Sequence, residues 1–260
     1  MNHVAAQGTT PPGTLGEQQA AGWVRQMFGR VAPRYDLLNH LLSFNIDKGW
    51  RRRLLEAVKP TLEKRGAVAL DLCCGTGDVL LELRRHAAGA MVLGADFCHP
   101  MLLAADRKIQ ARRYRPQLFE GDALELPLGA DSLDAITIAF GFRNFANYEK
   151  GLRELARVLK PGGVLAILEF SHPRNKLVAA GYSVYSKVIL PWIGGLISGS
   201  SDAYTYLPES IKKFPAAERL REMMAQAGFA EARYELLTGG IAALHVGVKE
   251  KSKSQPFERG

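Results

Sequence analysis

The chain has 260 residues, of which 47% are hydrophobic, and it carries a formal net charge of +8 at pH 7. This length is sufficient for one large domain with additions that buries a full core. The three cysteines, Cys73, Cys74 and Cys98, are odd in number and lack metal-ligand spacing, so they favour reduced cytosolic thiols over disulfides and indicate no metal site. The positive charge suggests an anionic partner such as a membrane surface or nucleic acid, although the basic residues are scattered and also fit solvated helix faces.

The first part of the chain is predicted to be a tail followed by a helical cap. Residues 1–17 are polar and rich in Gly, Pro and Thr, so we expect a disordered tail there, and neither a signal peptide nor a membrane anchor. Helical spacing follows at about Gln18–Arg30, Tyr35–Ser43 and Asp47–Val58, which predicts an N-terminal helical cap over residues 18–66.

From residue 67 the pattern changes to alternating strands and helices, which continue to residue 250. Helices are predicted from Asp78, from Met101 and over Tyr148–Leu159, where Lys160-Pro161-Gly162-Gly163 is expected to stop the helix. The predicted strands are Ala67–Cys73, Met91–Asp96, Gln117–Glu120, Leu133–Ala139 and Val164–Phe170. Repeated strand-helix units indicate a parallel sheet and an α/β fold.

The end of the chain has a different pattern. A predicted helix over Pro215–Ala227, stopped by Gly228, precedes strands at Ala232–Leu237 and Ile241–Val248. The short Thr238-Gly239-Gly240 connection between these strands predicts an antiparallel hairpin. The sheet is therefore expected to have seven strands and to be mostly parallel, with a second tail at residues 251–260.

A glycine loop joins the first predicted strand to its helix. Gly75 and Gly77 lack a Cβ, so the loop around Thr76 can adopt positive φ and bring backbone N–H groups close to a ligand at a helix N-terminus. The third glycine of a dinucleotide loop is missing, and a carboxylate, Asp71, lies four positions before Gly75. This carboxylate suits a cationic ligand, and S-adenosylmethionine fits because its ammonium and sulfonium centres are positive. A purely structural strand-to-helix turn is the alternative.

Two further strand ends carry polar groups that suit the same ligand. Asp96 ends the second strand, where a parallel neighbour would present it to ribose hydroxyls, although it could also cap the following helix. Asp122 follows the third strand and could accept from an adenine amino group, while Ala123 could donate its backbone N–H to the ring. Since ligands of open α/β sheets bind at the carboxyl ends of strands, one cofactor could span all three turns.

An apolar insertion interrupts the pattern at residues 173–214. Lys187, Pro191 and Gly194-Gly195 break its apolar runs below the length of a transmembrane helix. We interpret the insertion either as a cap that packs against the core or as a lid over an apolar substrate.

Several motifs resemble those of one family. They are Tyr35-Asp36-Leu-Leu-Asn39, Trp50-Arg51, the glycine loop, Phe140-Gly141-Phe142-Arg143-Asn144, Lys160-Pro161-Gly162-Gly163 and Leu168-Glu169-Phe170-Ser171. With them the chain closely resembles the ubiquinone/menaquinone biosynthesis C-methyltransferases over about Val24–Lys249. It departs from the family pattern at Ala139, where a serine is frequent, and at Asn45 and Asp47, where many relatives have glycine and histidine.

The resemblance implies a class I S-adenosylmethionine-dependent methyltransferase fold, which is Rossmann-like, with the cofactor at Thr76, Asp96, Asp122 and Ala123. It implies C-methylation of a prenylated naphthoquinol, demethylmenaquinol, to menaquinol in the last step of menaquinone biosynthesis. C-methylation of a benzoquinol in ubiquinone biosynthesis and a non-catalytic quinone-binding module are the alternatives.

Within this resemblance, Arg143 is the candidate catalytic residue that binds the quinol oxygen electrostatically, and Asn144 is expected to position Arg143. A structural role for these two residues, as a loop salt bridge or a turn cap, is the alternative. Tyr35, Asp36 and Asn39 are candidate substrate-binding residues that either close the active site or pack the cap. His245 lies in the last strand and is expected to be a structural histidine.

Two other enzyme classes are disfavoured because their sequence motifs are missing. A nucleic-acid methyltransferase is not expected, because the fourth strand ends in Ile138-Ala139-Phe140-Gly141 without a Pro-Pro-aromatic turn and no Pro-Cys motif occurs. A short-chain oxidoreductase is disfavoured since neither Tyr182 nor Tyr185 is followed by a lysine four residues later.

We expect a cytoplasmic protein in peripheral contact with the inner face of the plasma membrane, and a homodimer is one possible assembly.

Overall fold

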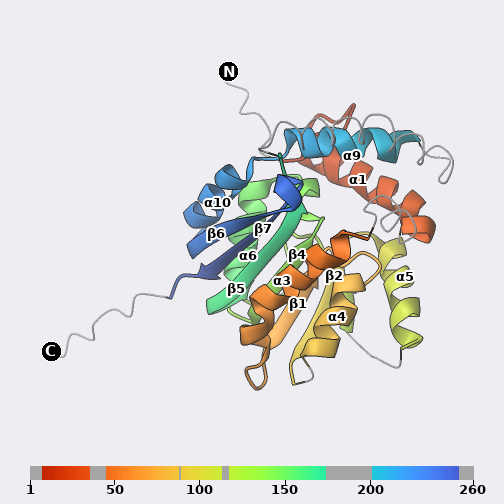
Figure 1. The fold of residues 1–260 in the computed structure, drawn as a ribbon. Coiled ribbons are helices and arrows are strands. Elements are labelled where there is room, and N and C mark those ends of the chain that lie inside the picture. The colour runs from red at the N-terminus through yellow and green to blue at the C-terminus, as the bar shows by residue number, and fades with distance from the viewer. Residues whose placement is uncertain (1–7, 36–44, 88, 113–116, 174–200, 252–260) are drawn as a thin grey trace.

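The computed structural model describes residues 8–35, 45–87, 89–112, 117–173 and 201–251 (Figure 1). In this part of the chain seven strands form one sheet in the order β3-β2-β1-β4-β5-β7-β6. The strands are β1 Val68–Leu72, β2 Met91–Asp96, β3 Gln117–Glu120, β4 Leu133–Ala139, β5 Leu159–Phe170, β6 Phe229–Leu237 and β7 Ala242–Lys249. Strands β1 to β5 are parallel, whereas β7 pairs antiparallel with both β5 and β6. The predicted mostly parallel sheet with a C-terminal hairpin is confirmed.

Helices cover both faces of this sheet. They are α1 Glu17–Val31, η1 Ala32–Arg34, α3 Asp47–Leu62, α4 Asp78–His86, α5 His99–Gln110, η2 Phe142–Asn144, α6 Tyr148–Val158, α9 Ser201–Lys213, α10 Ala217–Gln226 and η4 Thr238–Gly240. Apolar residues of α3, α4 and α5 share one core cluster with the sheet, and those of α6 and α10 share the other. The domain is therefore a three-layer α/β structure.

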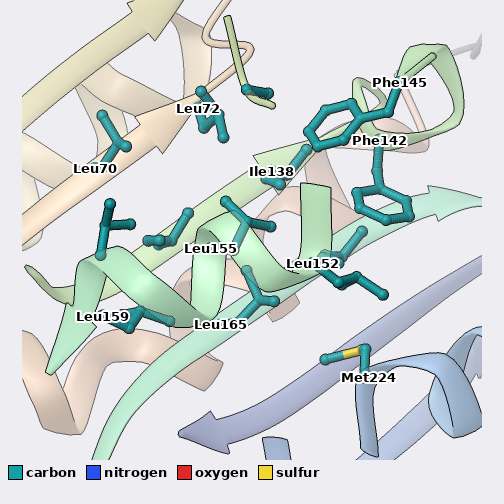
Figure 2. Close-up of a cluster of buried hydrophobic side chains, with 14 of the residues drawn as sticks. Leu70, Leu72, Ile138, Phe142, Phe145, Leu152, Leu155, Leu159, Leu165 and Met224 are labelled. Atoms are coloured by element: carbon teal, nitrogen blue, oxygen red, sulfur yellow. The ribbon is translucent and has the colours of Figure 1, made fainter. Parts of the chain in front are cut away.

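The α6 side shows how sequence periodicity builds this core (Figure 2). Leu152 and Leu155 of α6 are fully buried and lie one helical turn apart, so they face the sheet together. They pack with Leu70 of β1 and Ile138 of β4, while Met224 of α10 closes the same cluster. The helix starts at Asn147, whose side chain accepts from the Lys150 N–H at 2.9 Å.

Strand β5 begins five residues earlier than the sequence predicted. Leu159 leaves α6 with extended backbone and pairs with Leu133 of β4, before the register shifts between Leu133 and Ala135. Gly162 adopts φ +80° within this irregular start. α6 ends at Val158, one residue before the predicted end, but Lys160-Pro161-Gly162-Gly163 is part of the strand and does not separate it from the helix as predicted.

Helices α1 and α9 lie together at one end of the sheet (Figure 1). The rings of Trp23 in α1 and Tyr206 in α9 are 5.0 Å apart, and Arg25 of α1 lies over the Phe97 ring that follows β2. Helix α9 belongs to the predicted insertion at residues 173–214, of which residues 174–200 lie outside the described part. Among the helices of the described ranges, none has the length and hydropathy needed to cross a membrane.

The segment before α1 contacts the domain at Thr9, although composition predicted a disordered tail there. Thr9 is buried, its N–H donates to the Phe145 carbonyl at 2.8 Å, and its hydroxyl lies 2.7 Å from the Tyr206 hydroxyl. Polar side chains that find partners in this way leave no hydrophobic signal in a sequence.

Candidate active site

The glycine loop has the backbone that the sequence predicted. Gly75 has φ +55°, and Gly77, with φ +87°, is the N-cap of α4, so the loop leads directly into a helix N-terminus. Cys73 also adopts positive φ, at +56°. Such a conformation is uncommon outside glycine and is concentrated at functional sites.

Asp96 connects the second strand end to this loop. Its carboxylate accepts from the Gly75 N–H and from the Cys98 N–H, both at 2.9 Å. Burial raises the pKa of Asp96 to about 6, against the opposing effect of these backbone hydrogen bonds. The side chain thus contacts the predicted cofactor loop and the start of α5 at the same time.

The third turn lies next to the second. The Gly121 N–H donates to the Asp96 carbonyl at 3.1 Å, and the carboxylate of exposed Asp122 accepts from the Leu124 N–H at 2.9 Å. Ala123 is buried behind this turn. The structure therefore brings together the candidate cofactor residues of all three strand ends.

Asp71 occupies a different position from the other candidates. It is 1% exposed within β1 and accepts from the Thr137 hydroxyl of β4 at 2.8 Å, while its Oδ2 is buried without a hydrogen-bond partner in the described ranges. Burial raises the pKa of Asp71 to about 7, although the Thr137 hydrogen bond lowers it. Asp71 is thus buried in the sheet, where its hydrogen bond to Thr137 joins β1 to β4.

A charged network supports the loop from behind, and the sequence did not predict it. The Lys108 ammonium group lies 3.2 Å from the Thr76 hydroxyl and 2.7 Å from Asp78, the first residue of α4. Arg51 of α3 contacts Asp78 and lies 3.1 Å from Asp47. Although burial of Asp78 opposes ionisation, Arg51 and Lys108 lower its pKa to about 2. These ion pairs fix the loop between α3 and α5.

Arg143 forms a buried ion pair on η2, directly after β4. Its Nη1 lies 2.9 Å from Glu169 Oε1 and also donates to the Phe140 carbonyl, and its backbone N–H donates to Glu169 Oε2 at 3.1 Å. Burial acts to lower the pKa of Arg143, but Glu169 raises it, so the guanidinium stays charged. Glu169 was not predicted as a site residue, although it is the only ionisable residue in the Val164–Phe170 stretch.

We expected the Asn144 side chain to bind Arg143, but its hydrogen bond in the described part of the chain is to α9. Its Oδ1 accepts from the Tyr206 hydroxyl of α9 at 2.9 Å, so this residue joins the η2 turn to α9. In the described part of the chain it is Glu169 that pairs with the Arg143 guanidinium. Tyr148 adds a third contact to the turn, since its hydroxyl donates to the Arg143 carbonyl at 3.0 Å.

Tyr35 is the one predicted substrate residue that the structure describes. Its ring lies 3.7 Å from the position that a Cβ would occupy on Gly75, and it packs edge-on against Phe28 with 6.1 Å between ring centroids. Tyr35 therefore lies over the glycine loop. Asp36 and Asn39, together with Tyr182 and Tyr185 of the oxidoreductase alternative, lie outside the described residues.

His245 is placed as a structural residue. It is 1% exposed on β7, and its Nε2 lies 2.9 Å from the Ala217 carbonyl at the start of α10. Burial lowers its pKa to about 4, so the ring is neutral at physiological pH. The cysteines are free thiols, and burial raises the pKa of each.

Comparison with known proteins identifies the family. Residues 14–249 match the model of the ubiE/COQ5 methyltransferase family. The chain is 57% identical over 221 residues to demethylmenaquinone methyltransferase of Thermus thermophilus, which covers 85% of this chain and 99% of that protein. It is 46% identical to ubiquinone/menaquinone biosynthesis C-methyltransferase UbiE of Syntrophotalea carbinolica, over 86% of this chain and 93% of that one.

The fold comparison agrees with the sheet topology. A solved S-adenosylmethionine-dependent methyltransferase from Thermotoga maritima, described as a possible histamine N-methyltransferase, superposes with a TM-score of 0.59 at 20% identity. The match covers 86% of this chain and 99% of that one. With the methyltransferase fold and a family match over most of its length, this chain belongs to the ubiE/COQ5 methyltransferase family.

Proposed function

We propose that this protein transfers a methyl group from S-adenosylmethionine to a ring carbon of demethylmenaquinol, a prenylated naphthoquinol, and so forms menaquinol. The observation that carries the proposal is the 57% identity to a demethylmenaquinone methyltransferase across 99% of that protein. The juxtaposition of the glycine loop, Asp96 and the Asp122 turn supports it, because the three strand ends that would hold the donor are hydrogen-bonded to one another.

The residues present fit this methyl donor. Gly75 and Gly77 give the loop the positive φ that close backbone approach requires, and Asp71 supplies a buried carboxylate with an unpartnered oxygen for a cationic ligand. Asp96 would accept from ribose hydroxyls, with Asp122 and Ala123 at the adenine. When bound, S-adenosylmethionine supplies an electrophilic methyl group on its sulfonium.

Arg143 would stabilise the quinol oxygen. A ring carbon beside a phenolic oxygen becomes nucleophilic as the hydroxyl loses its proton, so the protein must bind the developing oxyanion and orient the ring. Two hydrogen bonds occupy Nη1, whereas Nε is buried without a hydrogen-bond partner in the described part of the chain. This leaves N–H donors of a fixed, permanently charged guanidinium for a phenolic oxygen. Tyr35, Asp36 and Asn39 would close the site over the substrate.

The proposal is tested by mass spectrometry of quinones after incubation of the purified protein with S-adenosylmethionine and demethylmenaquinol. Menaquinol is the expected product, and its absence with a cofactor-bound protein would instead favour the non-catalytic quinone-binding module. We expect Arg143→Ala to abolish turnover while calorimetry shows unchanged binding of S-adenosylhomocysteine. Quinones from cells that lack and then regain the gene would identify the substrate in vivo.

A benzoquinol of ubiquinone biosynthesis is the second candidate substrate. The 46% identity to a relative named for both ubiquinone and menaquinone biosynthesis favours including it. The same assay with a prenylated methoxybenzoquinol decides between the two, because kcat/KM for each substrate is measured on one protein preparation.

We further propose that the protein is cytoplasmic and contacts the inner face of the plasma membrane. The prenyl tail of the substrate partitions into the bilayer, and the net charge of +8 is attracted to anionic lipid. Sedimentation with phosphatidylglycerol vesicles, compared with phosphatidylcholine vesicles, tests this: we expect binding only to the anionic vesicles and less of it at high salt.

A further inference from the structure

Three aromatic rings gather where β4 and β5 end. The ring centroids of Phe140, which follows β4, and Phe170, the last residue of β5, are 4.8 Å apart. Trp50 of α3 lies 6.1 Å from the first and 6.4 Å from the second. Trp50 is buried, and its indole N–H donates to the Thr238 hydroxyl at 2.8 Å, so it forms a fixed wall behind the two partly exposed phenylalanines.

The backbone at Phe140 has an unfavourable conformation and lies next to the glycine loop. Phe140 has φ +59°, which is a genuine outlier for a bulky side chain and is maintained only where the surroundings impose it. The next residue, Gly141, lies so close to the loop that a Cβ there would be 2.4 Å from the Cβ of Cys73. The phenylalanine pair therefore adjoins the loop at which the methyl donor is proposed to bind.

The same pair adjoins the guanidinium of Arg143. The Cζ of Arg143 lies 5.4 Å from the centroid of the Phe170 ring, and its Nη1 donates to the carbonyl of Phe140. An aromatic surface formed by two rings tilted at 38° to each other, the Arg143 cation and the proposed methyl-donor loop thus lie next to one another. A phenolic ring that receives a methyl group needs an apolar surface to orient it, a cation for its oxygen and a nearby methyl donor.

We propose that Phe140 and Phe170 form the binding face for the fused ring system of the substrate, and that these two rings stabilise a bound naphthoquinol more than a methoxylated benzoquinol. The inference rests on the proposed function and deepens it. A fused second ring gives the substrate more apolar surface to pack against the two phenyl groups, whose planes differ by 38°. Methoxy oxygens at the same place would lose their hydration against apolar carbon without gaining a hydrogen bond.

The competing interpretation is that the three rings only pack α3 against the sheet, since Phe140 and Phe170 also border the α3 core cluster. Phe140→Leu and Phe170→Leu distinguish the two, because leucine keeps apolar volume but removes the stacking surface. Tyr234→Leu is the matched control. Tyr234 is a partly buried ring on edge strand β6, 5.6 Å from the His245 ring, and so is far from β4 in strand order.

Binding is measured first, without turnover, by quenching of tryptophan fluorescence. The probes are a fully substituted dimethylnaphthoquinone and a fully substituted dimethoxybenzoquinone, neither of which can be methylated or attacked by thiols. In both phenylalanine variants we expect the Kd of the naphthoquinone to rise about tenfold while that of the benzoquinone changes less than about threefold. Tyr234→Leu is expected to leave both Kd values unchanged, and calorimetry should show unaltered binding of S-adenosylhomocysteine in all three variants.

Selectivity in turnover provides the second readout. The ratio of kcat/KM for demethylmenaquinol to that for the methoxybenzoquinol should fall about tenfold in Phe140→Leu and Phe170→Leu. An unchanged ratio and unchanged Kd values in variants that bind S-adenosylhomocysteine normally would overturn the inference. If the wild-type protein methylates neither quinol, it is the proposed function that fails, so the two failures are distinct.

Discussion

Removal of the Glu169 carboxylate is expected to destabilise the protein and to slow the reaction, because it leaves the Arg143 cation buried and uncompensated. Glu169 is fully buried, and it accepts from both the side chain and the backbone N–H of Arg143. Glu169→Gln keeps the shape of the side chain and removes only its charge. Arg143→Met removes the opposite charge with little loss of volume.

The magnitude follows from the burial of the pair. Breaking a buried ion pair by removing one partner costs about 3–5 kcal/mol, whereas replacing both partners by neutral groups costs much less. We therefore expect each single variant to lose about 3 kcal/mol of unfolding free energy. The double variant should lose clearly less than the sum, which gives a coupling energy of about 2 kcal/mol or more in a double-mutant cycle.

The assay is urea unfolding followed by circular dichroism, with equal m-values confirming comparable transitions. Glu154→Gln is the matched control, because Glu154 pairs with the more exposed Arg157 at 2.6 Å, and loss of such a pair costs at most about 1 kcal/mol. In kinetics at a temperature where Glu169→Gln is fully folded, we expect kcat to fall about tenfold with an unchanged KM for S-adenosylmethionine. Additive losses, or a cost for Glu169→Gln no larger than for Glu154→Gln, would refute this reasoning.

Three further results are expected. Asp96→Ala should weaken binding of S-adenosylhomocysteine in calorimetry by about tenfold or more, since a charge-assisted acceptor is lost, and an unchanged Kd would contradict the ribose assignment. Buried, neutral His245 has a pKa of about 4 in the folded protein, against 6.5 in the unfolded chain. Its contribution to the unfolding free energy is therefore present above pH 6.5 and is lost as the pH falls toward 4. Between pH 7 and 5 the wild type should therefore lose about 2 kcal/mol more unfolding free energy in urea titrations than His245→Gln. Gly141→Ala should lower the melting temperature and cofactor affinity together, because its methyl group would overlap Cys73, and a variant that melts like the wild type would show that the backbone yields there.

Hydrophobic pattern and turn chemistry were enough to predict the central strands. β2 ends at Asp96 and β3 at Glu120, and β4 ends two residues before Gly141; the predicted bounds of all three strands are those of the structure. The three cofactor turns followed from the same reasoning, because parallel strands place their carboxyl ends at one edge. The start of β5 was missed, since Pro161 and Gly162 normally end elements, and here they form an irregular strand paired with β4.

Side-chain partners that are distant in sequence could not be predicted. Glu169 meets Arg143 only because β5 lies beside β4 in the sheet, and Tyr206 meets Asn144 only because α9 packs on the η2 turn. The contact of Thr9 with Tyr206 joins residues 197 positions apart. Periodicity records which face of an element is buried, but the identity of the group opposite a polar residue is decided by tertiary structure.

The position of β7 in the sheet determines when the domain can fold during synthesis. This last strand lies between β5 and β6, and β6 joins the sheet only through it. Until Ala242–Lys249 has left the ribosome, β5 keeps an open apolar edge, which is a template for aggregation in a nascent chain. A premature stop codon before this strand would therefore remove an internal member of the sheet and leave β6 without its partner strand.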